Sequence, residues 1–432
     1  MTSVGKAGSN LLLYFQPRPI AAFLLGIASG FPLTLLLATM TYWLSKVGVD
    51  KKTIGFAVGL TTPYTLKFLW APLIDRWRLP ILSGLIGHRR SWLVLTGVLL
   101  AIAVIMLGRS DPVNDLGGFA LWAVATAFLS ATQDIVIDAY RIEILPDEQL
   151  AYGTAMNQFG YRVGSALIGG ALVVWLASPE GASLGWAGAY GLSTLCILAG
   201  WAAALWCGET HKERPLENWS FARWMSTAVA GPFREFFSRR GALLILLFIM
   251  IYKIGDAMGQ IMLSPMIVEL GFTDTEYIAA NKAVGFWALI AGTAVGPMFL
   301  SWAGMGRGLF WSGVLMMASN LGFTVLALLG HQPWALGVAV GIENFTSGLG
   351  LTVFATYLSG LTNASFTATQ YALLSSLAAV GRTFLSTPSG YLAEGFGWPG
   401  FYLFTTLAAL PGLLLLWLIW RSGIVSAAIR AQ

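Results

Sequence analysis

Two carboxylic acids, Asp134 and Asp138, lie one helical turn apart in the sequence SATQDIVIDAYR at residues 130–141. They lie at the end of a long apolar run. A charged side chain inside such a run costs several kcal/mol of free energy unless it is paired or hydrated. Residues i and i+4 of a helix share a face, with Cβ atoms about 5–6 Å apart. The pair therefore indicates a place where a proton, a cation or a cargo molecule reaches the interior of an apolar helix.

Other charged residues also fall inside apolar segments. The basic ones are Lys67, Arg162, Lys253, Lys282 and Arg382, and the further acids are Asp256 and Glu343. Five positive and four negative charges are near balance, so simple ion pairing is one interpretation. Because buried pairs seldom outperform apolar packing, a water-filled cavity explains so many charged helices better. In such a cavity, cations hold a carboxylate or phosphate, and an acid can carry a proton.

The composition is that of an integral membrane protein. Of the 432 residues, 56% are hydrophobic and only 10% are charged, and the mean hydropathy is +0.71, whereas soluble domains have about a quarter charged residues. The net charge of +5 arises in short loops between apolar runs, which indicates membrane topology rather than nucleic-acid binding. Cys196 and Cys207 share one apolar segment, so a disulfide framework is not expected.

The apolar segments predict an all-α protein. A bilayer core requires about 20 apolar residues per helix. Twelve segments meet this length: 20–44, 53–74, 91–108, 117–141, 150–177, 185–207, 241–268, 276–300, 308–330, 335–359, 367–391 and 399–420. The longest polar connection follows the sixth segment. The chain is therefore predicted to form a six-helix bundle at 1–207, a cytoplasmic linker at 208–240 and a second six-helix bundle at 241–432.

The basic residues predict the orientation. Outside the predicted helices, sixteen Lys and Arg residues fall on the side of the N-terminus and four on the other. Cytoplasmic loops hold the excess of Lys and Arg. We therefore expect both termini to be cytoplasmic.

Three matches between the halves predict an internal repeat. Residues 44–55 align with 267–278, with Gly48 on Gly271. Arg162 then aligns with Arg382, and GWAGAY at 185–190 with GWPGFY at 397–402. Parallel repeats of this kind are typical of carriers whose site lies between two bundles.

Local spacing suggests roles for some residues. Lys253 and Asp256 have the i,i+3 spacing of an ion pair, whereas Glu343 has no basic residue within one turn, which suits proton carriage. Lys282 can snorkel to the interface instead of binding cargo. Trp70 and Trp287 could stack a sugar ring, although ordinary helix packing is the alternative.

Enzyme motifs are absent from the sequence. It has no P-loop and no His or Cys cluster with metal spacing, and its three His residues fall in predicted loops. We therefore expect no enzyme activity, cofactor or metal site.

Several motifs together resemble a known family. WAPLIDR at 70–76 with GHRR at 87–90 is similar to the helix 2 to 3 signature of the major facilitator superfamily, although about nine additional residues separate the two parts. Within that superfamily, the following motifs, in this order, resemble the muropeptide permease (AmpG) family: FLWAPLIDR at 68–76, SATQDIVIDA at 130–139, GYR at 160–162, YKIGD at 252–256, NK at 281–282, EN at 343–344 and ATQYALLS at 368–375 through Gly381-Arg382.

The resemblance implies a bacterial inner-membrane permease with twelve helices. Such permeases import N-acetylglucosaminyl-anhydro-N-acetylmuramyl peptides from periplasm to cytoplasm for peptidoglycan recycling, driven by protons. In some bacteria the imported peptides govern β-lactamase induction and thus antibiotic resistance. We expect a monomer whose partners are this cargo, protons and membrane lipids.

The expected site residues form three groups. The proton-coupling candidates are Asp134, Asp256 and Glu343. The cargo-binding candidates are Lys67, Trp70, Gln133, Asn157, Arg162, Lys253, Asn281, Lys282, Asn344, Gln370 and Arg382. By resemblance to facilitators, the gating candidates are Asp75, Arg76, Asp138 and Arg141, with Asp138 expected to pair with Arg76 and Arg141.

The sequence leaves two alternatives open. A related branch of the superfamily moves acetyl-coenzyme A, and the same cations could hold its phosphates. A membrane sensor or scaffold could also use the cavity for binding without transport.

Overall fold

The computed structural model describes residues 11–49, 59–60, 62–179, 181–210, 231–239, 241–363 and 365–422. In these ranges the chain divides into two compact helical units. The first comprises Met1–Pro232 with Ala364–Leu373, and the second comprises Phe233–Asn363 with Leu374–Gln432. Much of the predicted linker, at 211–230 and 240, lies outside the described residues, but its end forms helix α15 (Gly231–Ser238).

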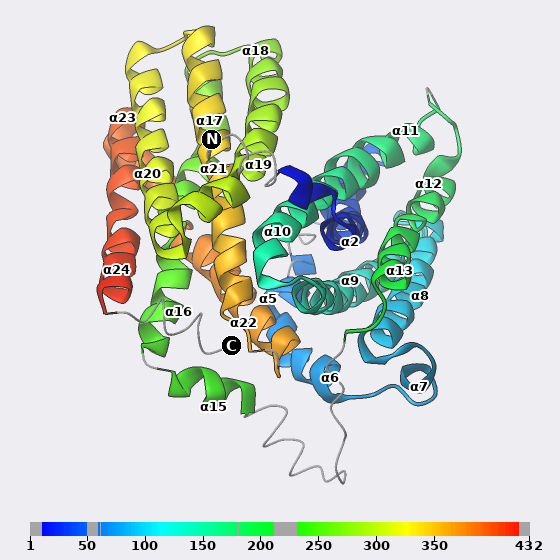
Figure 1. Ribbon diagram of the computed structural model, residues 1–432. Coiled ribbons are helices and arrows are strands. Elements are labelled where there is room, and N and C mark those ends of the chain that lie inside the picture. Colours follow the sequence, from blue (N-terminus) through cyan, green and yellow to red (C-terminus); the bar gives the residue numbers. More distant parts are fainter. Residues whose placement is uncertain are drawn as a thin grey trace. The chain divides into compact units, whose positions relative to one another are not determined.

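The first unit is built around one central helix. Helix α2 (Pro17–Thr34) packs against α9 (Leu116–Ile144), α10 (Asp147–Arg162) and α13 (Cys196–Cys207) (Figure 1). The remaining elements of this unit are η1 (Leu13–Phe15), η2 (Leu35–Thr39), α3 (Met40–Lys46), α5 (Thr62–Leu66), η4 (Lys67–Leu69), α6 (Ala71–Arg76), α7 (Leu82–Ile86), α8 (His88–Arg109), η5 (Val163–Leu172), α11 (Val173–Ala177) and α12 (Gly185–Ser193).

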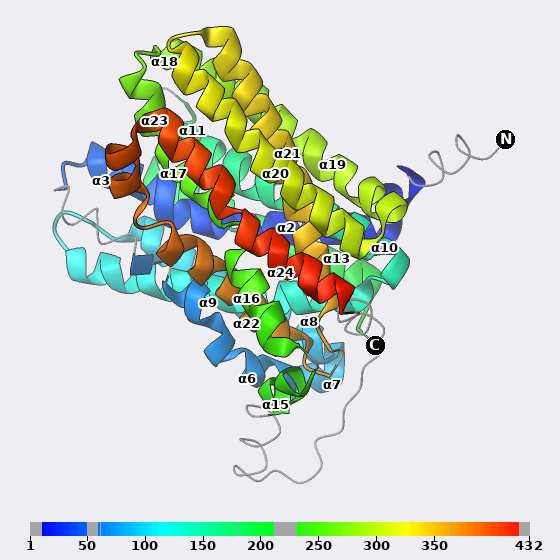
Figure 2. The same cartoon turned by 90° about the vertical axis from the view of Figure 1, so that its left-hand side faces the viewer.

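The second unit has long helices in close contact. Helix α20 (Met305–Leu329) packs against α21 (Pro333–Gly360), α23 (Ser389–Ala408) and α24 (Leu410–Arg421), and Figure 2 shows α24 beside α20 and α16. Its other elements are α16 (Ala242–Ile251), α17 (Ile254–Glu269), α18 (Asp274–Ile278), η7 (Ala279–Gly285) and α19 (Phe286–Ala303). Helix α22 (Thr367–Leu385) begins in the first unit and continues in the second.

Apolar sequence and local capping explain these helices. Ten helical stretches in the described ranges are long and apolar enough to cross a membrane. Asp115 begins α9, its carboxylate accepting the Gly118 N–H at 2.9 Å. Thr273 and Glu276 form a reciprocal capping box at the start of α18. These side chains satisfy backbone donors that have no partner within the helix.

Two of the twelve predicted helices, 53–74 and 367–391, are not among these ten stretches. Of 53–74, the described part forms α5, η4 and α6 instead of one helix, and residues 53–58 and 61 lie outside the described residues. Pro63 and Pro72 fall in this stretch, and proline removes backbone donors. The predicted helix 367–391 is interrupted after Leu385, because Pro388 precedes the new helix α23. Gly397, with φ of +64°, then divides α23.

The predicted internal repeat is visible in local structure. Gly48 and Gly271 both have positive φ, as do Gly185 and Gly397. Tyr190 donates a hydrogen bond to the carbonyl oxygen of Leu35 at 3.2 Å, and its repeat partner Tyr402 donates to that of Gly259 at 3.1 Å. Each tyrosine thus fixes a late helix of its half to the first helix of that half.

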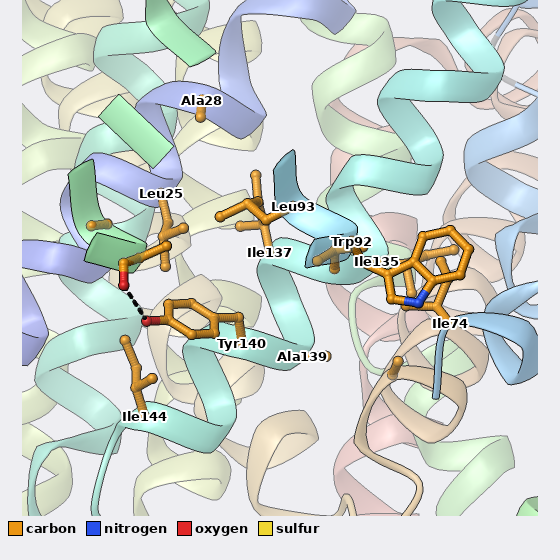
Figure 3. Packing of buried hydrophobic residues seen from close by; sticks show 14 of the residues in the cluster. Leu25, Ala28, Ile74, Trp92, Leu93, Ile135, Ile137, Ala139, Tyr140 and Ile144 are labelled. Atoms are coloured by element: carbon orange, nitrogen blue, oxygen red, sulfur yellow. Dashed lines mark hydrogen bonds between the residues drawn. The ribbon is translucent and has the colours of Figure 1, made fainter. Parts of the chain in front are cut away.

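An apolar core lies in the first unit. Figure 3 shows Leu25, Trp92, Ile137 and Tyr140 packed together, each at most 6% exposed. The Tyr140 hydroxyl donates to the carbonyl oxygen of Gly208 at 2.5 Å. This hydrogen bond satisfies the polar tip of a side chain that is otherwise buried among apolar groups.

Close helix contacts depend on glycine. A Cβ at Gly160 of α10 would overlap the carbonyl group of Phe23 in α2, and one at Gly381 of α22 would overlap that of Met250 in α16. These are equivalent helix pairs of the two halves. Small residues allow such close backbone approach in membranes.

Gly160→Ala should therefore destabilise the protein. Overpacking typically costs about 1–3 kcal/mol, so we expect a lower melting temperature in detergent. Gly191→Ala is the control, because a Cβ there meets nothing within 4 Å and alanine favours the helix. Equal melting temperatures for the two variants would contradict the packing argument.

Candidate functional site

A charged cluster in the first unit is centred on Lys67. Its ammonium lies 2.5 Å from Asp134 Oδ2 and 3.6 Å from Asp138 Oδ2. Arg141 Nη2 lies 3.5 Å from Asp138 Oδ1. Asp134, Asp138 and Arg141 come from α9, while Lys67 lies in η4, where its helix is interrupted. The cluster holds two cations and two anions and is therefore balanced.

Neighbouring helices support this cluster with hydroxyl groups. Ser29 of α2 donates to Asp134 at 2.6 Å, and Arg141 donates to Thr154 of α10 at 3.0 Å. The Arg141 guanidinium also lies 5.5 Å from the centre of the Tyr371 ring. Asp134 and Asp138, for which different roles were expected, thus share one cation.

A second charged cluster lies in the second unit. Lys253 and Asp256 form the predicted ion pair, at 3.4 Å. Asp256 also accepts a hydrogen bond from Ser347 of α21 at 3.4 Å. Glu343, one turn before Ser347, is only 1% exposed. Lys253 occupies the break between α16 and α17, so here too a cation lies at an interrupted helix.

The predicted amide side chains have varied surroundings. Asn157 donates to the carbonyl oxygen of Ala22 at 3.2 Å and Gln370 to that of Pro232 at 3.3 Å. Asn281 and Asn344 donate to carbonyls one turn earlier in their own helices. Gln133 is buried, and its amide has no hydrogen-bond partner within the described residues.

The two tryptophans that could stack a sugar ring have different surroundings. The Trp70 indole donates to Thr132 at 3.1 Å, and its ring packs at 4.8 Å on Phe128. Trp287 was expected deeper in its helix, but it is 67% exposed on α19. Exposure on a membrane helix places this ring at the protein surface, so the structure does not support a buried stacking role for it.

Two of the remaining cations are described. Arg162 is half-buried at the end of α10, and its guanidinium makes no ion pair or hydrogen bond within the described ranges. Arg382 is exposed in the last turn of α22. The side chain of Lys282 lies outside the described part of the structure.

Asp75 joins a buried network that includes the start of α22. Its carboxylate accepts the backbone N–H groups of Ala368 and Thr369, at 3.1 and 2.8 Å, and the Thr369 hydroxyl at 2.6 Å. Arg89 lies 2.7 Å from both Asp75 and Glu143. A carboxylate at a helix N-terminus is stabilised by the unpaired donors and the helix dipole.

The expected pairing of Asp138 with Arg76 is not present among the described residues. Asp138 pairs with Lys67 and Arg141, while the Arg76 guanidinium lies 5.0 Å from the centre of the Phe366 ring. Arg89, in the first turn of α8, instead pairs with Asp75 and Glu143.

Sequence reasoning missed three members of this network: Arg89, Glu143 and Glu209. The Glu209 carboxylate accepts the backbone N–H groups of Arg89 and Arg90, at 3.0 and 3.2 Å. The motif GHRR at 87–90 was recognised as part of a loop signature, which contains Arg89. No local pattern around Glu143 or Glu209 indicates that these acids contact residues 87–90.

Among the described residues, no group of three or more His, Cys, Asp or Glu side chains could hold a metal ion. The two clusters instead offer fixed charges and hydroxyl groups inside membrane-spanning helices. Such groups can attract a polar cargo and exchange protons.

The family model of the Major Facilitator Superfamily matches residues 22–386. The chain belongs to this superfamily of membrane transporters, and it is a multi-pass membrane protein with a small-molecule cargo. Two solved members have the same fold: FucP in the outward conformation (TM-score 0.65, 14% identity, 94% of this chain and 99% of that chain) and the human organic anion transporter MFSD10 (TM-score 0.64, 15% identity, 92% and 99%).

Similar proteins show to which family within the superfamily the chain belongs. The chain is 39% identical to the anhydromuropeptide permease of Escherichia coli (strain K12), over 94% of this chain and 80% of that protein. It is 35% identical to the putative transporter AmpG 4 of Rickettsia conorii, over 92% of this chain and 95% of that one. The chain therefore belongs to the AmpG family of permeases.

A double substitution tests the Lys67 cluster. Lys67→Gln leaves buried acids without their cation, and removing one partner of a buried pair costs about 3–5 kcal/mol. We expect a marked fall in melting temperature, and the added substitution Asp134→Asn should recover most of it. The control His331→Gln removes the more exposed pair with Glu276 and should change stability little. If the double variant is no more stable than Lys67→Gln, the pairing is not what stabilises the cluster.

Proposed function

We propose that this chain is a proton-coupled anhydromuropeptide permease. It imports N-acetylglucosaminyl-anhydro-N-acetylmuramyl peptides across the bacterial inner membrane by alternating access, with both termini in the cytoplasm, and acts as a monomer. The observation that carries the proposal is the pair of charged clusters inside the helices of a chain 39% identical to an anhydromuropeptide permease.

The clusters suit this cargo. Its peptide carries carboxylates and an amine, and its sugars carry hydroxyl and amide groups. The cations of these clusters can exchange an acidic partner for a cargo carboxylate, and transporters that work by alternating access typically bind their cargo near the membrane midplane. The excess of Lys and Arg on one side supports the orientation.

Asp75 fits the role of a gate residue. Its carboxylate binds the first turn of α22 and the Arg89 guanidinium together. An arrangement that depends on a few charge-assisted hydrogen bonds can break and reform as the transporter changes state. Glu143 shares Arg89 and belongs to the same gate.

Uptake into proteoliposomes tests the proposed function. With the outside acidic, labelled anhydromuropeptide should accumulate inside, and a protonophore should abolish accumulation. Accumulation that persists without the gradient would contradict proton coupling. Inhibition by coenzyme A esters would favour the acetyl-coenzyme A alternative, and binding without counterflow would favour a sensor.

Arg162 is the best candidate for binding a cargo carboxylate. Lys67 and Lys253 are already neutralised by acids, whereas Arg162 has no acidic partner among the described residues. It directly precedes η5, a π-helical stretch, and such distortions are frequent at functional sites. A cargo carboxylate would supply the missing anion.

Arg162→Gln should therefore raise the KM for uptake. A charge-assisted hydrogen bond contributes about 1.5–3 kcal/mol, which corresponds to roughly 10- to 100-fold in affinity. Arg162→Lys should recover part of the loss. Arg307→Gln, near the start of α20, is the control, and an unchanged KM for Arg162→Gln would remove Arg162 from the cargo site.

A further inference from the structure

Glu343 is a buried acid whose oxygens lack hydrogen bonds. It lies in the middle of α21, its side chain is 1% exposed, and neither carboxyl oxygen has a hydrogen-bond partner among the described residues. An ionised carboxylate in such a place loses its hydration without replacement, which costs several kcal/mol. The environment therefore favours the protonated carboxyl.

The titratable neighbours of Glu343 are few. Asp256, Lys253 and the phenol of Tyr402 interact with it electrostatically, and the side chain of Gln260 is a neutral polar neighbour. Of the helices packed against α21, α19 has no titratable residue and α20 has only Arg307, near its start. The η7 segment contributes Lys282, whose side chain is outside the described part. Among the described residues, Asp256 and Lys253 are therefore the charged groups that act on Glu343.

The charge count leaves one anion in excess. Asp256 already has the Lys253 ammonium at 3.4 Å and the Ser347 hydroxyl at 3.4 Å. Glu343 has neither kind of donor. Two ionised carboxyls beside one ammonium would leave a net negative charge in a buried site, and one bound proton removes it. Asp256 has donors that stabilise its ionised form and Glu343 has none among the described residues, so the proton is bound by Glu343.

We propose that Glu343 is the group that binds and releases the coupling proton, with Lys253 and Asp256 as its counter-charges. This deepens the proposed function and rests on it. In the loaded state the Glu343 carboxyl is neutral and Lys253 is paired with Asp256. On release, the proton passes from a Glu343 oxygen to water, and the Lys253 ammonium is shared between the two carboxylates. The Lys253 side chain can move toward the new carboxylate because it lies at the break between α16 and α17 rather than within a regular helix.

The first experiment separates the exchange of cargo across the membrane from its coupling to the proton gradient. Glu343→Gln imitates the protonated acid, so it should keep counterflow of labelled for unlabelled anhydromuropeptide but lose gradient-driven accumulation. It should also lose the cargo-dependent proton uptake that a pH-sensitive dye reports. Glu276→Gln, on the more exposed helix α18, should keep all three. Accumulation by Glu343→Gln at the wild-type level would overturn the proposal.

A wild type without counterflow would instead refute the proposed permease function, so the two failures are distinguishable. A second measurement covers the case in which Glu343→Gln does not fold. Infrared spectra of wild-type protein labelled with 13C-glutamate should show the carbonyl stretch of a protonated glutamate at neutral pH. Asp256→Asn should weaken this band, because the Lys253 ammonium then has only the Glu343 carboxylate as its counter-charge. Absence of that band from the wild type would overturn the proposal without any variant of Glu343.

Discussion

The cost of a charge in an apolar interior governs this structure. Both paired intramembrane lysines among the described residues lie where a helix is interrupted: Lys67 in η4, and Lys253 between α16 and α17. At these places the backbone departs from the regular helix, so the side chain can reach acids on a neighbouring helix or turn. The same interruptions leave backbone groups that need partners, and irregular backbone at membrane depth is tolerated only inside protein or beside water. At Lys67 and Lys253, a buried charge and a helix break therefore occur together.

Close packing and charge-assisted hydrogen bonds have different roles in the first unit. Glycines such as Gly160 bring α10 so near to α2 that no side chain fits between them, and contacts of this kind do not rearrange easily. The network of Asp75, Arg89 and Glu143 instead relies on a few polar contacts at the start of α22. The first kind of contact suits a rigid part of a transporter, whereas the second kind suits the gate that we propose.

Much of the fold could be predicted from the sequence because its determinants are local. Hydropathy located most of the helices, and the i,i+3 spacing predicted the pair of Lys253 and Asp256. The GW motifs led to Tyr190 and Tyr402, which make equivalent hydrogen bonds in the two halves. The breaks near Lys67 and Pro388 were missed, because apolar composition alone does not distinguish one helix from several short ones.

The site was less predictable because its contacts join distant positions. Asp75 meets Thr369 across 294 residues, and Arg89 meets Glu143 across 54. A single sequence contains no signal for such pairs. The expectation that Asp138 pairs with Arg76 followed from the resemblance to the major facilitator superfamily. In the structure, Asp138 forms ion pairs with Lys67 and Arg141.

The two charged clusters differ in one respect that bears on mechanism. In the first unit, Lys67 and Arg141 balance Asp134 and Asp138, so no proton is needed for neutrality. In the second, Lys253 balances Asp256, and Glu343 is left over. A balanced cluster can change partners without taking up a proton, whereas an unbalanced one must bind a proton or a cation to remain buried. Charge balance therefore favours a division in which the first cluster responds to cargo and the second to the proton gradient.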